Sequence, residues 1–232
     1  MKFTNVIVGC GGAGGWVAML LAKSPDRAPL VLVDGDTIEE RNLERQLFGP
    51  SDIGRNKALA LSIKLKRMGL EVEAFKEYLR YGSKAWDRIL GEEGQVRIYC
   101  CPDNHPCRMA CLQLADMRRE DGRQTVVAIS GNEEFTAQAD VYLPGWKGTD
   151  EDYRVKYPET VTATDGDPLH PPCTGEAVAV QPQRALANAV AAVNTAWLME
   201  LWAERITDET DELIRDMAPR GITYGKYNLN KN

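Results

Sequence analysis

Residues 6–16 read Val6-Ile7-Val8-Gly9-Cys10-Gly11-Gly12-Ala13-Gly14-Gly15-Trp16, an apolar run that passes through a glycine-rich turn into a helical pattern. Gly9, Gly11 and Gly14 have the spacing that lets the backbone turn tightly and pack the following helix against the strand. Such a turn directs amide N–H groups and the helix N-terminus at one point, where an anion is favoured. We therefore expect a phosphate at this turn.

A second apolar run, Leu30 to Val33, ends at Asp34. A carboxylate at the end of the second strand can bond the hydroxyl groups of a ribose. These two features fit any nucleotide, including the cofactor of a nicotinamide- or flavin-dependent oxidoreductase.

The patterns along the chain predict an α/β protein with a Rossmann-like nucleotide-binding fold, whose mixed, mainly parallel sheet has an antiparallel extension. Residues 1–232 are expected to form a single domain, with a mobile crossover loop over 145–172 and a C-terminal extension over 205–232. The strands are expected at residues 2–8, 30–33, 71–76, 95–101, 125–129, 135–143 and 221–229. The helices are expected at residues 13–22, 55–68, 83–90, 105–119, 182–202 and 209–217.

Two of these helices have an apolar stripe that we expect to be buried or to form an interface. The stripe of the helix over 55–68 consists of Leu59, Leu61, Ile63 and Leu65. The stripe of the long helix that begins at Pro182 consists of Leu186, Val190, Val193, Trp197 and Leu201. Asn188, Asn194 and Glu200 interrupt this helix, so we do not expect it to span a membrane.

The charge and the cysteine content of the chain argue against several classes of function. The formal net charge of -6 and the pI of about 5.1 argue against broad nucleic-acid binding, which needs a concentrated basic face. No cleavable leader is apparent at the N-terminus, and the six cysteines contain no CxxC pair, so we expect a cytoplasmic protein without a disulfide framework. Cys107 and Cys111 lie four apart on one helix face, but no second pair closes a tetrahedral site, so no zinc is expected.

A dense series of polar residues follows the second strand and separates the alternatives. It reads Asp34-x-Asp36, Asn42-Leu43-x-Arg45-Gln46, Asp52-Ile53-Gly54 and Lys57. Dinucleotide dehydrogenases require no such series. Together with Asp103-Asn104, Arg108 and Cys173, it resembles the ThiF, MoeB and HesA family of adenylylating enzymes, which is related to the adenylation domains of ubiquitin-activating enzymes.

The resemblance implies an ATP- and Mg²⁺-dependent adenylyltransferase that activates the C-terminal carboxylate of a small ubiquitin-like or sulfur-carrier protein ending in Gly-Gly. It also implies a homodimer. Joining a carboxylate to a phosphate brings two anions together, so cations must line the pocket. By this resemblance the catalytic residues are Arg45, Lys57, Asp103 and Cys173. The nucleotide-binding residues are Gly9, Gly11, Gly12, Gly14, Asp34, Asp36, Asn42, Arg45, Gln46, Lys57 and Asn104.

The same resemblance implies individual roles. Arg45 and Lys57 hold phosphates, Asp34 holds the ribose, and Asp103 holds the magnesium ion. Asp36 assists on the ribose or metal side. Asn42 bonds phosphate oxygens, and Gln46 braces these residues. In some family members a cysteine at the position of Cys173 takes the activated acyl group.

Each role has a plainer alternative. Arg45 and Lys57 can be surface cations, Asp103-Asn104 the N-cap of a helix, and Arg108 an exposed helix residue. Cys173 can equally be an inert small side chain, and His170 is interpreted as a solvated loop histidine.

Two departures from the family bear on activity. Many relatives have an N-terminal helix whose arginine reaches the partner's ATP, and only Met1 to Asn5 precede the apolar run that begins at Val6, so we expect that arginine to be missing. No sulfur-transfer or ubiquitin-fold domain is expected after the adenylation domain. The missing arginine leaves an ATP-binding scaffold that has lost catalysis as one alternative. The glycine turn leaves a nucleotide-binding oxidoreductase as another.

Overall fold

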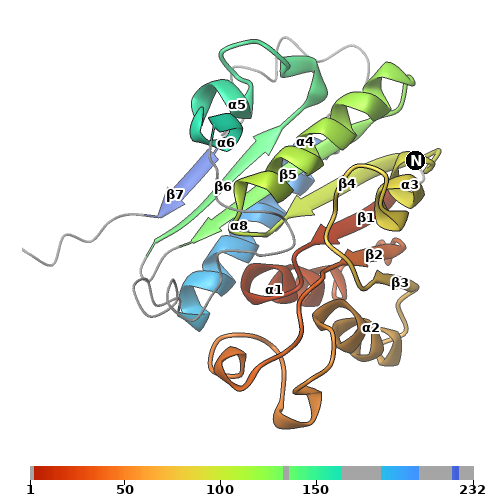
Figure 1. Ribbon diagram of the computed structural model, residues 1–232, viewed down its shortest axis with the longest axis vertical. Coiled ribbons are helices and arrows are strands. Elements are labelled where there is room, and N and C mark those ends of the chain that lie inside the picture. The colour runs from red at the N-terminus through yellow and green to blue at the C-terminus, as the bar shows by residue number, and fades with distance from the viewer. Residues whose placement is uncertain (1–2, 133–135, 163–183, 204–220, 225–232) are drawn as a thin grey trace, which may run out of the picture.

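The computed structural model describes residues 3–132, 136–162, 184–203 and 221–224. These residues form one seven-stranded sheet in the order β3-β2-β1-β4-β5-β6-β7, with helices on both faces (Figure 1). The strands are β1 (Phe3–Val8), β2 (Leu30–Val33), β3 (Val72–Phe75), β4 (Gln95–Cys100), β5 (Thr125–Asn132), β6 (Ala137–Tyr142) and β7 (Gly221–Tyr224).

The first five strands are parallel, and the last two extend the sheet antiparallel. The predicted Rossmann-like fold with its antiparallel extension is thus confirmed. The chain runs outward from β1 to β2 and β3, then returns to the other side of β1 with β4. At this reversal Val8 pairs with both Val33 and Cys100, so three strands end side by side. Open α/β sheets bind ligands at such a reversal.

Alternation along the strands divides the core between the two faces of the sheet. The helices on these faces are α1 (Gly12–Leu21), α2 (Lys57–Arg67), α3 (Lys84–Leu90), α4 (His105–Glu120) and α8 (Ala185–Ala203). Ile7 shares a core cluster with residues of α1, α2 and α8, whereas Val6 and Val8 share one with residues of α3 and α4. Figure 1 shows α4 crossing one face and α1 and α8 lying on the other.

Strand β5 is longer than the sequence predicts. The pattern ends it at Ile129 and makes Ser130-Gly131-Asn132 its closing loop, but these three residues pair with Ala137–Ala139 of β6. The antiparallel neighbour supplies ladder partners that the sequence of β5 alone does not indicate. The longer strand places Asn132 close to the point where the strand order reverses.

The apolar stripe predicted for α2 is only half right. Leu61 and Leu65 are buried, but Leu59 is 41% exposed and Ile63 is 40% exposed. Helix α2 turns Ala58 inward with Leu61 and Leu65, which places all three on one helical face.

Three of the five residues in the stripe predicted for α8 face outward. Leu186, Val193 and Trp197 are 75%, 52% and 45% exposed, so of the two predicted alternatives, core or interface, the core is wrong for these three. Val190 and Leu201 are partly buried against the core. The inner face of α8 instead carries small and polar residues beside larger ones, and this face packs on α1, β5 and β6. Small side chains allow the close approach of α8 to its neighbours. Leu186, Val193 and Trp197 are left on the opposite side.

The crossover predicted over 145–172 is described as far as Thr162. This part contains the 3-10 turn η3 (Pro144–Trp146) and two short helices, α5 (Tyr153–Lys156) and α6 (Glu159–Thr162). Trp146 and Tyr153 are buried, and Arg154 Nη1 donates to Asp116 Oδ2 of α4 at 2.8 Å. The first part of the crossover is therefore packed and helical rather than a continuous loop.

Several predictions fall wholly or partly outside the described residues. Residues 163–172 of the crossover, the helix predicted over 209–217, and both His170 and Cys173 lie there. Of the strand predicted over 221–229, the structure describes β7, which pairs with β6. None of the helices in the described residues is long and apolar enough to span a membrane.

Candidate functional site

A cavity of about 280 Å³ opens at the ends of β1, β2 and β4, where the strand order reverses. It brings together most of the residues that the sequence singles out. Those lining it are Gly9, Gly11, Gly12, Asp34, Asp36, Asn42, Arg45, Gln46, Lys57, Asp103 and Asn104. Gly14 lies behind the wall, and Cys173 is outside the described residues.

The glycine turn forms the floor of this cavity. Gly9 has φ +82°, a conformation that favours glycine. A Cβ on Gly14 would lie 1.8 Å from the carbonyl oxygen of Gly9, so only glycine lets α1 pack this close to the turn. Gly11 is the N-cap of α1 and has no side chain with which to cap the first-turn amides. These amides and the helix dipole therefore favour an anion in the cavity.

Asp34 is a buried carboxylate at the end of β2. Its Oδ2 accepts a hydrogen bond from Cys10 N at 2.6 Å, and its Oδ1 accepts one from Asp36 N at 2.8 Å. Burial raises the pKa of Asp34 to about 6, although Lys57 and the two amides oppose the shift. The carboxylate is thus fixed in orientation beside the glycine turn, and each oxygen can accept one more hydrogen bond.

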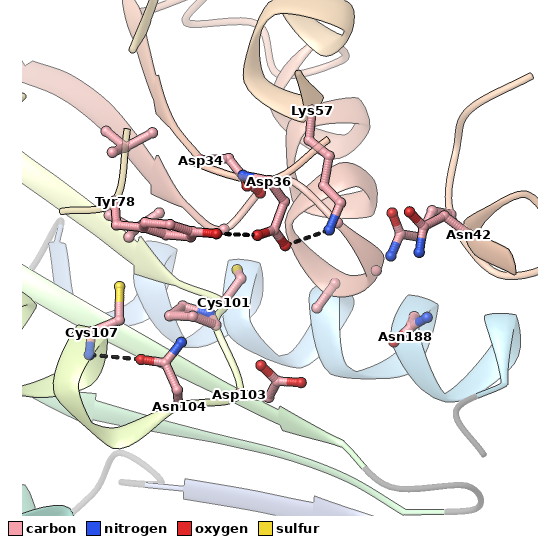
Figure 2. A pocket seen from close by; sticks show the side chains of 18 of the residues that line it. Asp34, Asp36, Asn42, Lys57, Tyr78, Cys101, Asp103, Asn104, Cys107 and Asn188 are labelled. Carbon is pink, nitrogen blue, oxygen red and sulfur yellow. Dashed lines mark hydrogen bonds and ion pairs between the residues drawn. The ribbon is translucent and has the colours of Figure 1, made fainter. Parts of the chain in front are cut away.

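Asp36 joins two other residues of the cavity, as Figure 2 shows. Lys57 Nζ donates to Asp36 Oδ2 at 2.6 Å, and the Tyr78 hydroxyl donates to Oδ1 at 2.6 Å. Burial alone would raise the pKa of Asp36, but Lys57 and Tyr78 outweigh it and hold this pKa below its usual value. Tyr78 lies against Gly35, where a Cβ would come within 2.7 Å of its ring. Lys57 is therefore a buried cation at the cavity with a carboxylate partner.

The opposite end of the cavity contains polar atoms that lack partners in the described part of the chain. They are Arg45 Nε, Gln46 Oε1 and Asn188 Oδ1. Arg45 is only 9% exposed, and its backbone oxygen accepts from Asn188 Nδ2 at 3.2 Å. Buried polar atoms without partners are rare and costly in proteins. Arg45 Nε is a donor and suits an anion, whereas the two amide oxygens are acceptors and suit a ligand that also donates hydrogen bonds.

Asn42 and Asn104 each have a local structural role. Asn42 Oδ1 accepts from Glu39 N at 2.9 Å, and Asn42 lies in the 3-10 turn η1 (Glu40–Asn42). Asn104 Oδ1 accepts from Cys107 N at 2.9 Å, which confirms that Asn104 is the N-cap of α4. Each amide nitrogen remains as a donor at the cavity wall. Arg108 lies outside this wall, and its Nη2 donates to Ser130 O at 3.3 Å.

The ThiF family model matches residues 2–213. The chain belongs to the ThiF family. It is 26% identical over 148 residues to ubiquitin-like modifier-activating enzyme 5 of Arabidopsis thaliana, a match that covers 56% of this chain and 34% of the relative. The chain spans about a third of the length of the curated relatives it matches.

Two solved structures show the same fold at low sequence identity. The crystal structure of E. coli MccB with ATP is 23% identical, has a TM-score of 0.55, and is matched over 84% of this chain and 54% of that one. E. coli tRNA N6-threonylcarbamoyladenosine dehydratase, TcdA, is 16% identical, has a TM-score of 0.56, and is matched over 88% of both chains.

Asp103 is an exposed carboxylate at the mouth of this ThiF-family cavity. Within the described ranges, no three His, Cys, Asp or Glu residues are grouped so that they could hold a metal ion. Mg²⁺ commonly binds through one or two carboxylates together with substrate phosphates. Asp103 fits this mode, in which the phosphates provide the other ligands.

Several residues of the site are not indicated by any motif in the sequence. Tyr78, Glu39 and Arg41 line the cavity, as does Asn188, which comes from α8. Asn188 is 143 residues from Arg45 along the chain. The only feature of the sequence that could have indicated it is a polar residue on a mostly apolar helix. Arg41 directly precedes the ThiF-family residues Asn42-Leu43, and only the fold shows that it reaches the cavity.

Proposed function

We propose that this chain uses ATP to adenylylate a substrate carboxylate and releases pyrophosphate. The observation that carries the proposal is the meeting of three elements in one cavity: the glycine turn, the buried Asp34 and the cations Arg45 and Lys57. Arg45 has a buried Nε without a partner in the described residues, as expected of a side chain that binds an anion. Membership of the ThiF family supports the same reaction.

The roles proposed for the residues follow from charge and position. Arg45 and Lys57 hold phosphate oxygens, helped by the amide of Asn42. Asp34 accepts hydrogen bonds from the ribose. Such fixed cations favour the negative charge that builds up when the substrate carboxylate attacks the α-phosphate.

The supporting residues complete this arrangement. Asp36 holds Lys57 at the cavity, and Gln46 braces the glycine turn, since its amide lies 3.1 Å from where a Cβ on Gly11 would be. Asp103 would hold a magnesium ion, which neutralises phosphate charge when it is bound.

We further propose that the carboxylate is the C-terminus of a small ubiquitin-like or sulfur-carrier protein ending in Gly-Gly. Similarity to ubiquitin-like modifier-activating enzyme 5 from two organisms supports a protein substrate. Cys173 is our proposed acceptor of the activated acyl group, through thiolate attack on the acyl-adenylate with AMP as the leaving group. A short peptide is the second candidate, because solved MccB structures contain MccA.

Nucleotide-dependent stability tests the cavity. Mg-ATP at about a hundred times its dissociation constant should stabilise the wild-type chain by roughly 2.7 kcal/mol. Asp34→Asn should lose most of this gain, whereas Asp26→Asn, at an exposed position, should keep it. Thermal melts with Mg-ATP and with NAD(H) measure both. Stabilisation by NAD(H) alone would favour an oxidoreductase instead.

Pyrophosphate exchange then separates an enzyme from an ATP-binding scaffold that has lost catalysis. Incorporation of labelled pyrophosphate into ATP should require a carrier protein with a free Gly-Gly carboxylate, and a carrier lacking the last glycine should give none. Cys173→Ser should keep exchange but lose a thiol-sensitive adduct with the carrier. Binding of ATP without exchange for any carrier or peptide would contradict the proposed activity.

A further inference from the structure

The cations at the cavity differ in whether they form an ion pair with a carboxylate. Lys57 is paired with Asp36, and Arg41 is paired with Glu39 through Nε–Oε2 at 2.8 Å and Nη2–Oε1 at 3.1 Å. Arg45 has no carboxylate partner within 4 Å in the described residues. Two of the three cations that line the cavity are therefore held by carboxylates of the same wall.

Arg41 differs from an ordinary surface arginine in its position. It belongs to η1, next to the buried Asn42, whose backbone and side chain both bond to the backbone of Glu39. This double contact fixes the turn that carries Arg41 at the cavity. The positive charge of Arg41 is also one of the causes that lower the pKa of Asp36, so its field reaches the Lys57 pair.

The pair with Glu39 can be exchanged at low cost. The side chains of Arg41 and Glu39 are 37% and 55% exposed, and pairs this exposed contribute little to stability. A guanidinium binds phosphate oxygens in the same two-pronged way as it binds a carboxylate. A polyphosphate in the cavity therefore competes with Glu39 for Arg41 on favourable terms.

We propose that Arg41 is a third phosphate-binding residue, which exchanges Glu39 for the outer phosphates of ATP when the nucleotide binds. The inference rests on the proposed function, because it assumes a triphosphate in this cavity. Asp34 and the glycine turn hold the ribose and the inner phosphate, which leaves the outer phosphates for η1. When pyrophosphate leaves, Glu39 recovers Arg41, so the exchange also eases product release.

Calorimetric titration with Mg-ATP and with AMP tests the exchange. Arg41→Gln should weaken Mg-ATP binding by on the order of tenfold, since it removes charge-assisted hydrogen bonds, and should leave AMP binding unchanged. Glu39→Gln should strengthen Mg-ATP binding by about two- to fivefold, because the competing carboxylate is gone. The double variant should behave like Arg41→Gln.

Arg55→Gln is the matched control, because Arg55 is exposed and lies outside the cavity wall. An equal loss of AMP and ATP binding in Arg41→Gln would show that Arg41 supports the shape of η1 and would overturn the proposal. So would an Arg41→Gln chain that binds both nucleotides as the control does. If the wild-type chain bound no Mg-ATP, the proposed function itself would fail with it.

Discussion

Asp34 shows how much one side chain is constrained at this site. Its two oxygens accept hydrogen bonds from two backbone amides. Burial and the nearby Asp36 raise its pKa, whereas Lys57 lowers it. A carboxyl group in such surroundings loses its proton at a higher pH than it would in water. Its ionisation is consequently linked to folding.

This linkage predicts a pH dependence of stability. The pKa of Asp34 is about 6 in the folded chain, against 3.8 for an ordinary aspartate. Between these values the folded chain holds a proton that the unfolded chain has lost, so this contribution to the free energy of unfolding falls as pH rises. Relative to Asp34→Asn, the wild-type chain should lose on the order of 1 to 3 kcal/mol from about pH 4 to pH 6.5.

Urea unfolding at several pH values measures this difference. The comparison with Asp34→Asn cancels most of the opposite trend from Asp36, Asp52 and Asp152, whose pKa values are lowered. Asp26→Asn controls for loss of a carboxylate at the surface. A difference between wild type and Asp34→Asn that stays flat or rises with pH would contradict the assignment.

At the scale of elements, α4 is joined to the turn between α3 and β4 by one buried cation. Arg118 is fully buried, and its guanidinium donates to the carbonyls of Ile89, Leu90, Glu92 and Gly94. Its Nε also donates to Thr125 Oγ1 of β5 at 2.9 Å. Burial, with some repulsion from Arg123, lowers its pKa to about 10, so it stays charged at neutral pH.

Replacing this arginine should therefore be costly. Arg118→Met keeps the length of the side chain but removes the side-chain donor of the Glu92 and Gly94 carbonyls, whereas Ile89 and Leu90 keep donors in Glu92 N and Arg123 Nη1. We therefore expect a loss of about 2 to 4 kcal/mol in the free energy of unfolding. Arg119→Met, at the exposed neighbouring position, should change it by less than about 0.5 kcal/mol. Chemical denaturation compares the two. Equal effects would show that the bonds of Arg118 contribute nothing net.

Elements were predictable where local sequence determines them. The strand, glycine turn and helix at the N-terminus, the strand before Asp34 and the N-cap Asn104 all follow from neighbouring residues. The inner faces of α2 and α8 do not, because periodicity shows which residues share a face but not which face meets the sheet. The same limit hid Asn188 and Tyr78, which reach the site only through tertiary packing.

At the scale of the whole molecule, the outer side of α8 is an exposed apolar surface of the kind that binds another protein chain. Leu186, Val193 and Trp197 lie exposed there on one helix. Large apolar side chains gathered on one surface commonly mark an interface. The homodimer expected from the family resemblance stays a prediction, and this face of α8 is where we place it.

Trp197→Glu should then weaken self-association by about thirtyfold or more, as expected for a tryptophan at the centre of an interface. Sedimentation velocity over a range of protein concentrations measures the shift from dimer to monomer. Val161→Gln, at an exposed apolar position of α6, is the control and should leave association unchanged. A wild-type chain that stays monomeric at high concentration would rule out this interface.

The position of β7 has a consequence for the nascent chain. β6 is made early, but its outer neighbour comes from residues 221–224, long after it in the sequence. At synthesis rates of about 5–20 residues per second, several seconds pass before β7 leaves the ribosome. Throughout that delay the free edge of β6 offers unpaired N–H and C=O groups to any other extended segment. Chaperone demand in the cell should therefore depend on how fast the last part of this chain is translated.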